Sequence, residues 1–119
     1  MYGSIKEIYY SDGSITYSTE KGYHNVDDKP AVIHSNGDRE WWQDGKRHRI
    51  GGPAVEWRNG GFKSWWVDGN RHRVDGPAII DKYGIEEWYY NGSHFPSKEW
   101  WFEALTKDEQ IAYLFNMEK

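Results

Sequence analysis

The chain has 119 residues and a net charge of −4, so it can bury a core as one domain and has no overall attraction to nucleic acid or anionic lipid. It contains no cysteine, which excludes disulfides and thiolate metal sites. The sequence shows no apolar run near the roughly 20 residues of a membrane span and no apolar signal-peptide stretch at its start, so we expect a cytoplasmic protein.

The aromatic content indicates a mainly β protein. Eight tryptophans and nine tyrosines occur in the chain, whereas the first leucine is Leu105. A core built from Trp, Tyr, Val and Ile suits strands better than helices, because β-branched and aromatic side chains pack well on a pleated surface.

Four β-hairpins are predicted in chain order, each around a turn that contains glycine. Asp-Gly and Asn-Gly pairs favour two-residue turns, since both central residues of a type I′ turn need a positive φ. The hairpins span residues 8–18, 31–43, 54–67 and 78–90, with turns at 12–13, 36–37, 59–61 and 83–84. The extra glycine of the third turn indicates a three-residue loop or a bulge. The longer connections between hairpins end at proline, which marks the start of the next strand.

The hairpins are copies of one another. The segment 41–45 (Trp-Trp-Gln-Asp-Gly) returns as 65–69 after 24 residues and as 88–92 after 23 more. Between the copies, the segment 48–54 (His-Arg-Ile-Gly-Gly-Pro-Ala) returns as 72–78. A period this short indicates one small supersecondary unit, copied and stacked. We therefore expect residues 1–95 to form a twisted antiparallel meander sheet of stacked hairpins with about eight strands.

The predicted turns also predict which side chains share a face, because side chains alternate along a strand. One face should carry a row of β-branched and aromatic residues that forms the core: Ile8, Tyr17, Val32, Trp41, Val55, Trp65, Ile79 and Trp88. The opposite face should carry Trp42, Trp66 and Tyr89, each paired with an alanine and lying among carboxylates such as Glu40 and Glu56. We expect this second face to be exposed.

The pattern changes at Pro96. Ser97 is a plausible N-cap, Thr106 and Glu109 have the spacing of a capping box, and Ile111, Leu114 and Phe115 recur at helical spacing. The sequence therefore predicts two short helices over residues 96–119. Their apolar surface should be buried against the sheet or its open end strand, as a cap on the same structural domain.

The repeat resembles known families. A hairpin repeat of 23 to 24 residues rich in Trp, Tyr and Gly resembles the MORN family, particularly its divergent variants. The phrase Trp-Trp-x-Asp-Gly-x-x-His-Arg-x-x-Gly-Pro-Ala is more similar to an uncharacterised repeat of tailed phages and large DNA viruses. The resemblance covers residues 5–95 and is most specific at 44–54 and 68–78. It implies an elongated single-layer sheet that serves as a scaffold or interaction surface, with no catalytic residues to transfer.

The first functional hypothesis is a non-enzymatic protein-interaction module without a cofactor. Trp and Tyr often dominate binding energy, so the expected contact surface is Trp42, Trp66 and Tyr89 with Glu40 and Glu56. The resemblance to phage repeats implies a narrower version, in which an accessory protein of a phage or mobile element binds and blocks a host protein in the host cytoplasm. The oligomeric state stays open.

The alternative is a binder of phosphate-bearing ligands, either a nucleotide or single-stranded nucleic acid. Four arginines, which could line one edge of the sheet as a comb beside tryptophan rings, and two histidines are the candidate anion-binding residues: Arg47, His48, Arg49, Arg71, His72 and Arg73. The competing interpretation pairs these arginines with the aspartates that recur beside them, and their joint recurrence favours it. A shared metal at His48 and His72 is disfavoured, because their backbones should lie roughly 9.6 Å apart in alternate strands.

Overall fold

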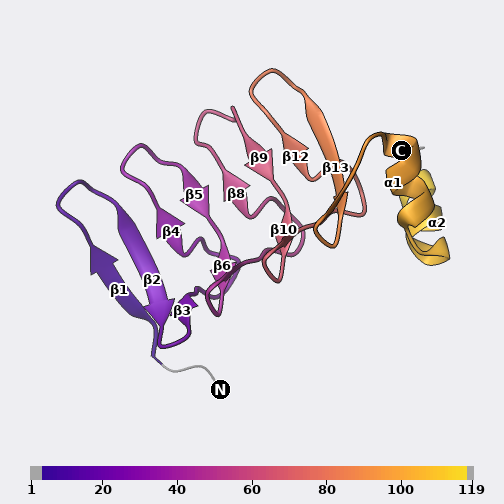
Figure 1. Ribbon diagram of the computed structural model, residues 1–119. Coiled ribbons are helices and arrows are strands. Elements are labelled where there is room, and N and C mark those ends of the chain that lie inside the picture. Colours follow the sequence, from indigo (N-terminus) through magenta and orange to yellow (C-terminus); the bar gives the residue numbers. More distant parts are fainter. Residues whose placement is uncertain (1–3, 118–119) are drawn as a thin grey trace.

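The computed structural model describes residues 4–117 as an elongated antiparallel sheet with two helices at its C-terminal end (Figure 1). The sheet forms a single layer, and the predicted mainly β, stacked-hairpin fold class is confirmed. The elements are β1 (Lys6–Tyr9), β2 (Ile15–Thr19), β3 (Gly22–Tyr23), β4 (Val32–Ile33), β5 (Arg39–Glu40), β6 (Trp42–Gln43), β7 (Lys46–Arg47), β8 (Val55–Glu56), β9 (Lys63–Ser64), β10 (Trp66–Val67), β11 (Asn70–Arg71), β12 (Ile79–Ile80), β13 (Glu86–Tyr90), β14 (Ser93–Phe95), α1 (Lys98–Ala104) and α2 (Lys107–Met117).

The main sheet has ten strands. Nine of them follow the order β1-β2-β4-β5-β8-β9-β12-β13-β14, and β3 pairs with β2. The two-stranded pairs β6-β7 and β10-β11 lie beside it. The spans of the four predicted hairpins account for ten of the strands, β6 and β10 among them. The other four strands, β3, β7, β11 and β14, are the return strands of a second set of small hairpins that the sequence pattern does not predict.

The predicted register of the four hairpins is wrong by one residue. Val32 pairs with Glu40 rather than Trp41, and Ile79 pairs with Glu87 rather than Trp88. In the second hairpin, His34 N–H donates to the Asp38 carbonyl, so the loop has three residues. Its glycine, Gly37, has φ +93°, whereas Asn36 is not in the left-handed region. This is a type I turn followed by a glycine bulge, and it replaces the predicted type I′ turn.

The two-residue turns occur instead at the Asp-Gly and Asn-Gly pairs that directly follow the second, third and fourth predicted hairpins. Asp44 and Gly45 have φ +48° and +80°, and Gln43 pairs with Lys46 around them, as a type I′ turn requires. The pairs at 68–69 and 91–92 have the same two positive φ values. Each of these turns therefore closes a small hairpin at the opposite end of the repeat from the glycine-bulge loop.

Successive repeats are joined at these small hairpins by a bond pattern that recurs three times. The backbone N–H of Gly45 donates to the Tyr23 carbonyl, and that of Asp44 donates to His24 Nδ1 at 3.1 Å. His48 Nδ1 accepts from Asp68 N–H at 3.0 Å, and His72 Nδ1 accepts from Asn91 N–H at 2.9 Å. Each histidine thus fastens the turn of the next repeat.

The one-residue change in register separates the residues of the predicted core row, because it moves every affected side chain to the other face. Val32, Val55 and Ile79 stay on one face, and their partners there are the polar residues Glu40 and Ser64 as well as Glu87. The tryptophans of the row lie on the opposite face beside buried alanines: Trp41, Trp65 and Trp88. The core of the sheet is therefore divided between its two faces.

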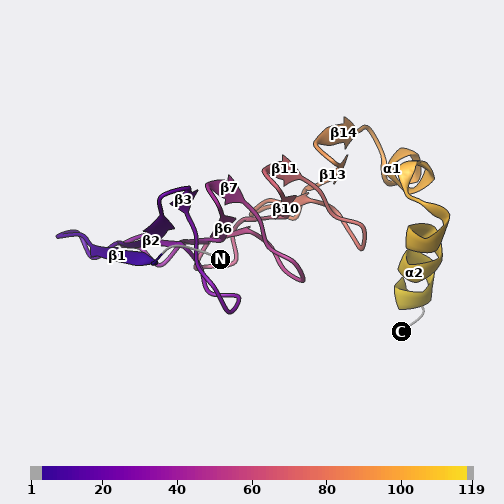
Figure 2. The same ribbon diagram turned by 90° about the horizontal axis from the view of Figure 1, so that it is seen from below.

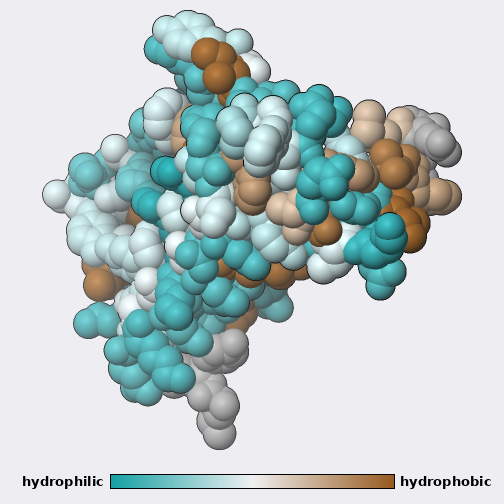
Figure 3. All heavy atoms as spheres, turned by 45° about the vertical axis from the view of Figure 1, so that its right-hand side comes forward, coloured by the Kyte–Doolittle hydropathy of each residue, from teal (hydrophilic) through white to brown (hydrophobic). Residues whose placement is uncertain are grey.

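The predicted helical cap is present at the β13–β14 end, where its buried residues are Trp101, Leu105 and Tyr113. Figure 2 shows that helix α2 and the long connections extend to one side of the sheet, while β3, β7, β11 and β14 lie on the other side. The predicted burial of the apolar residues of the second helix is wrong, because three of their side chains on α2 are exposed: Ile111, Leu114 and Phe115. In Figure 3, hydrophobic residues gather at this helical end.

Acidification should weaken the joint between the last two repeats through His72. Burial lowers the pKa of His72 below its ordinary value of 6.5, against the opposing charge of Glu109. The unfolded chain therefore binds this proton more readily, so the free energy of unfolding should fall as the pH drops below about 6.5 and should not depend on this group above it. Urea unfolding at pH 7 and pH 5 measures the loss.

The matched variant is His72→Asn, whose side-chain oxygen can still accept the Asn91 N–H but does not titrate. It should lose less stability than the native chain between pH 7 and pH 5. Equal losses in the two proteins would show that His72 does not control this pH dependence.

Candidate functional site

One face of the sheet carries a continuous row of aromatic and basic side chains from the small hairpins. Tyr23 contacts Trp42 with ring centroids 5.4 Å apart. The guanidinium carbon of Arg47 then lies 5.1 Å from the Trp42 ring centroid and 5.3 Å from that of Trp66. The guanidinium carbon of Arg71 lies 5.1 Å from the Trp66 ring centroid. We call this row the aromatic–arginine face.

The row continues through the last repeat. Arg71 lies 5.4 Å from the Tyr89 ring centroid, and Tyr89 contacts His94 at 4.9 Å. Rings and cations alternate along most of the face, so each guanidinium is stacked between two rings. The complete aromatic–arginine face consists of Tyr23, Trp42, Arg47, Trp66, Arg71, Tyr89 and His94.

Its members are only partly accessible. Trp42, Trp66 and Tyr89 are half-buried, whereas the two residues that end the row are exposed. The predicted contact residues Trp42, Trp66 and Tyr89 are thus brought together as expected. Their neighbours on this face are arginines, because each small hairpin returns the chain beside the ring of its own repeat: Trp42 pairs with Arg47 and Trp66 pairs with Arg71.

Sequence reasoning missed the two ends of the face, Tyr23 and His94. The repeat period could have identified them, because residues 23, 47, 71 and 94 occupy the same place in successive units at spacings of 24, 24 and 23. Tyr23 and His94 are therefore the terminal counterparts of Arg47 and Arg71.

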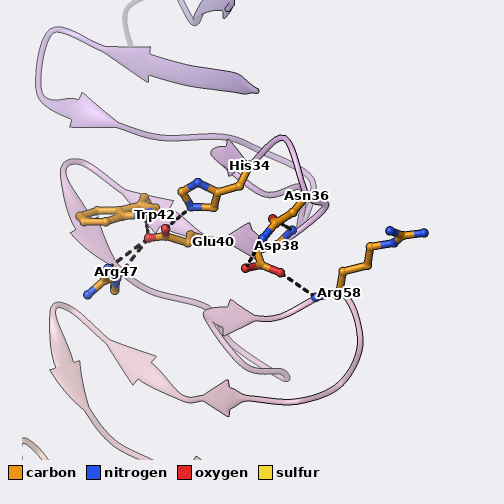
Figure 4. Close-up of polar contacts among 7 residues, drawn as sticks. All are labelled: His34, Asn36, Asp38, Glu40, Trp42, Arg47 and Arg58. Atoms are coloured by element: carbon orange, nitrogen blue, oxygen red, sulfur yellow. Dashed lines mark hydrogen bonds and ion pairs between the residues drawn. The ribbon is translucent and has the colours of Figure 1, made fainter. Parts of the chain in front are cut away.

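Glu40 holds the first part of the face together (Figure 4). Its Oε1 accepts from Trp42 Nε1 at 3.1 Å and from Nε and a terminal nitrogen of Arg47 at 3.3 and 3.2 Å. Its other oxygen lies 2.6 Å from His34 Nε2. Burial by itself would raise the pKa of Glu40, but the bonds from His34 and Trp42 and the charge of Arg47 outweigh it and lower that pKa.

Glu56, the second predicted carboxylate, lies on the other face. Glu56 pairs with Arg39 of the neighbouring strand, whereas Glu40 pairs with Val55, the residue before Glu56. Because neighbouring residues of a strand point to opposite faces, Glu56 shares its face with Trp41. Its carboxylate forms an ion pair with Arg39. The prediction that Glu56 belongs to the same contact surface as Trp42 is wrong.

The predicted arginine comb is divided between the faces. Arg49 lies 3.8 Å above the Trp41 ring, donates to the Pro53 carbonyl at 3.1 Å and pairs with Asp28. Arg73 repeats this arrangement on Trp65, with the Pro77 carbonyl and Asp75 as its partners. Strand β7 ends at Arg47, so the alternation of side chains does not continue to Arg49.

The histidines of the proposed anion site are also engaged in the framework. His48 and His72 each accept a backbone N–H of the following repeat. Within residues 4–117, no group of three or more His, Asp or Glu side chains is arranged to hold a metal ion. In the same part of the chain, no helix is both long and apolar enough to cross a membrane.

A groove of about 750 Å³ lies on the Trp41 face, between helix α2 and two connections. Its walls include Pro53, Trp65, Arg73, Val74 and Tyr113. The groove is mostly apolar, and it is not part of the aromatic–arginine face.

Comparison of the chain with protein-family models, with curated proteins and with solved structures gave no match. Function is therefore inferred from the geometry of the chain itself.

Proposed function

We propose that this protein is a non-enzymatic interaction module that binds a protein partner through its aromatic–arginine face. The observation that carries the proposal is the alternating row of Trp66, Arg71 and Tyr89 with its neighbours Trp42 and Arg47. Trp, Tyr and Arg are the residue types most enriched among those that dominate protein–protein binding energy.

The stacking supports the proposal in a second way. Each side chain inside the row is held between two neighbours, and Trp42 and Trp66 are also anchored by hydrogen bonds from Nε1 to Glu40 and Ser64. Side chains that are already ordered lose little conformational entropy when a partner binds, so more of the contact energy appears as affinity.

Phosphate binding through the arginine and histidine loops has less support. Arg49 and Arg73 already pair with aspartates and stack on core tryptophans, and Arg47 pairs with Glu40. The net charge of −4 also opposes a polyanion. The narrower form of the interaction proposal, an accessory protein that blocks a host protein, is supported by the resemblance of the repeat to those of phages and large DNA viruses.

The test compares Trp66→Ala with Trp57→Ala. Trp57 is 43% exposed and stacks on Phe62 beside the loop of the third hairpin. This loop lies at the opposite end of the repeat from the small hairpins that carry the proposed surface (Figure 1). The native chain is first used to capture a partner protein from extracts of cells that express the chain. The affinity between the chain and this partner is then measured by calorimetry. Trp66→Ala should weaken binding at least tenfold, whereas Trp57→Ala should change it less than twofold. Unchanged binding by a folded Trp66→Ala variant would refute the proposal.

A further inference from the structure

Arg47 and Arg71 occupy equivalent places in successive repeats, but only one of them has a carboxylate partner. Arg47 donates through Nε and a terminal nitrogen to Glu40. Arg71 forms no ion pair with any residue of the described chain, and its hydrogen-bond partner is the Tyr89 hydroxyl, 3.3 Å from one terminal nitrogen. Its Nε is buried and has no hydrogen-bond partner. A half-buried cation without a counter-charge is costly, unlike the paired arginine one repeat earlier.

Ser64 occupies the position from which a carboxylate would pair with Arg71. Glu40 and Ser64 lie in the same row, each paired with Val55. Ser64 accepts from Trp66 Nε1 at 2.8 Å, just as Glu40 accepts from Trp42 Nε1. Serine therefore keeps the hydrogen bond to the ring but is too short to supply the carboxylate that Arg47 has.

We propose that Arg71, held between Trp66 and Tyr89, is the recognition site for one carboxylate group, that of an aspartate or glutamate side chain on the partner protein. This inference rests on the proposed function and names the chemistry at the centre of the same face. The guanidinium presents a planar set of donors that matches a carboxylate, and the two flanking rings keep it in position. The same chain already uses this combination, since Glu40 binds Arg47 beside Trp42 and Trp66.

A carboxylate fits this place better than a phosphate chain. Among the arginines and histidines of this row within residues 4–117, Arg71 alone has no carboxylate partner, because Arg47 pairs with Glu40 and His94 lies 3.7 Å from Glu87. A chain of phosphates would gain one contact here and would be repelled by the net charge of the protein. A single carboxylate gains the same contact with less repulsion.

The experiment titrates the native chain with sodium acetate and follows the side-chain Nε–Hε signals of the arginines by NMR. The Arg71 signal should shift and saturate in the millimolar range, while the Arg47 signal should stay in place. Inorganic phosphate and sodium chloride at equal ionic strength are the parallel titrations. Tighter binding of phosphate than of acetate, or equal shifts at Arg47 and Arg71, would overturn the proposal.

Two variants exchange the residues that make the repeats differ. Ser64→Glu supplies the internal carboxylate, so it should remove the acetate response at Arg71 and raise the melting temperature. Glu40→Ser should make Arg47 respond to acetate, because it removes the counter-charge there. If acetate still shifts Arg71 in a folded Ser64→Glu variant, the proposal is wrong.

Measurements of partner binding by two variants test this inference separately from the proposed function. Ser64→Glu should lower the affinity of the chain for the captured partner about tenfold, because the internal carboxylate competes with the partner for Arg71. If Trp66→Ala abolishes partner binding and Ser64→Glu leaves it unchanged, the face binds the partner and the carboxylate site is refuted. If acetate binds at Arg71 and Trp66→Ala leaves the partner bound, the proposed function is the part that fails.

Discussion

Replacing Trp101 with alanine should lower the free energy of unfolding by about 3–5 kcal/mol, as expected for loss of a fully buried large aromatic. The Trp101 side chain is completely buried. Its ring packs 4.6 Å from Trp88 and 5.2 Å from Tyr113, and its Nε1 donates to the Arg73 carbonyl at 3.0 Å. It therefore joins helix α1 to the last strands of the sheet. Urea unfolding followed by circular dichroism measures the change.

The adjacent residue provides the control, because Trp100 is 67% exposed on the same helix. Trp100→Ala should change the free energy of unfolding by less than about 1 kcal/mol. Similar losses for the two variants would contradict the orientation of helix α1 on the sheet.

Trp41→Ala should also cost about 3–5 kcal/mol of unfolding free energy. The Trp41 ring is almost fully buried, and Arg49 covers it at 3.8 Å. Its Nε1 donates to the Asp28 carbonyl at 3.0 Å, so the variant also loses a bond that fastens the first long connection. Thermal unfolding should show a lower melting temperature together with faster proteolysis near Asp28.

Trp57→Ala serves as the control for this second prediction, since its ring lies in an exposed hairpin loop. It should cost clearly less than Trp41→Ala. If Trp57→Ala is the more damaging change, the division of the tryptophans between core and loop positions is wrong.

The stacked-hairpin fold was predictable because turn residues and aromatic pairs recur at a constant period. The register was not, because Asn-Gly is compatible with two loops. In a two-residue loop both residues have a positive φ, but here only Gly37 does, and Asn36 uses its side-chain oxygen to accept the Asp38 N–H at 3.0 Å. That single additional loop residue is enough to move Trp41 to the opposite face from Val32.

The composition of the candidate surface was predicted in part. Trp42, Trp66 and Tyr89 do share a face, because the one-residue change affects all repeats equally. The partners of these rings could not be predicted from the assumed register, since Arg47 and Arg71 reach them through small hairpins that lie beyond the ends of the predicted ones. Once these hairpins are known, the difference between Glu40 and Ser64 explains why the two arginines differ.

The orientation of helix α2 also could not be predicted from the sequence pattern. Ile111, Leu114 and Phe115 have helical spacing, but spacing does not say which side of a helix faces the sheet. Polar bonds orient it here: Glu109 accepts from the Tyr90 hydroxyl at 3.0 Å, and Gln110 donates to the Phe102 carbonyl at 2.9 Å. These contacts turn the side that contains Tyr113 inward and leave the apolar cluster outside.

Hydroxyl-radical footprinting of the tryptophans, with and without the captured partner, tests most directly the claim that a partner binds the aromatic–arginine face. In the free chain, Trp57 and Trp100 should be oxidised fastest and Trp41 and Trp101 slowest, in line with their burial. The bound partner should then protect Trp42 and Trp66 and leave Trp57 and Trp100 as reactive as before. Protection of Trp100 with unchanged reactivity at Trp42 and Trp66 would contradict the account and assign the binding surface to the helical end.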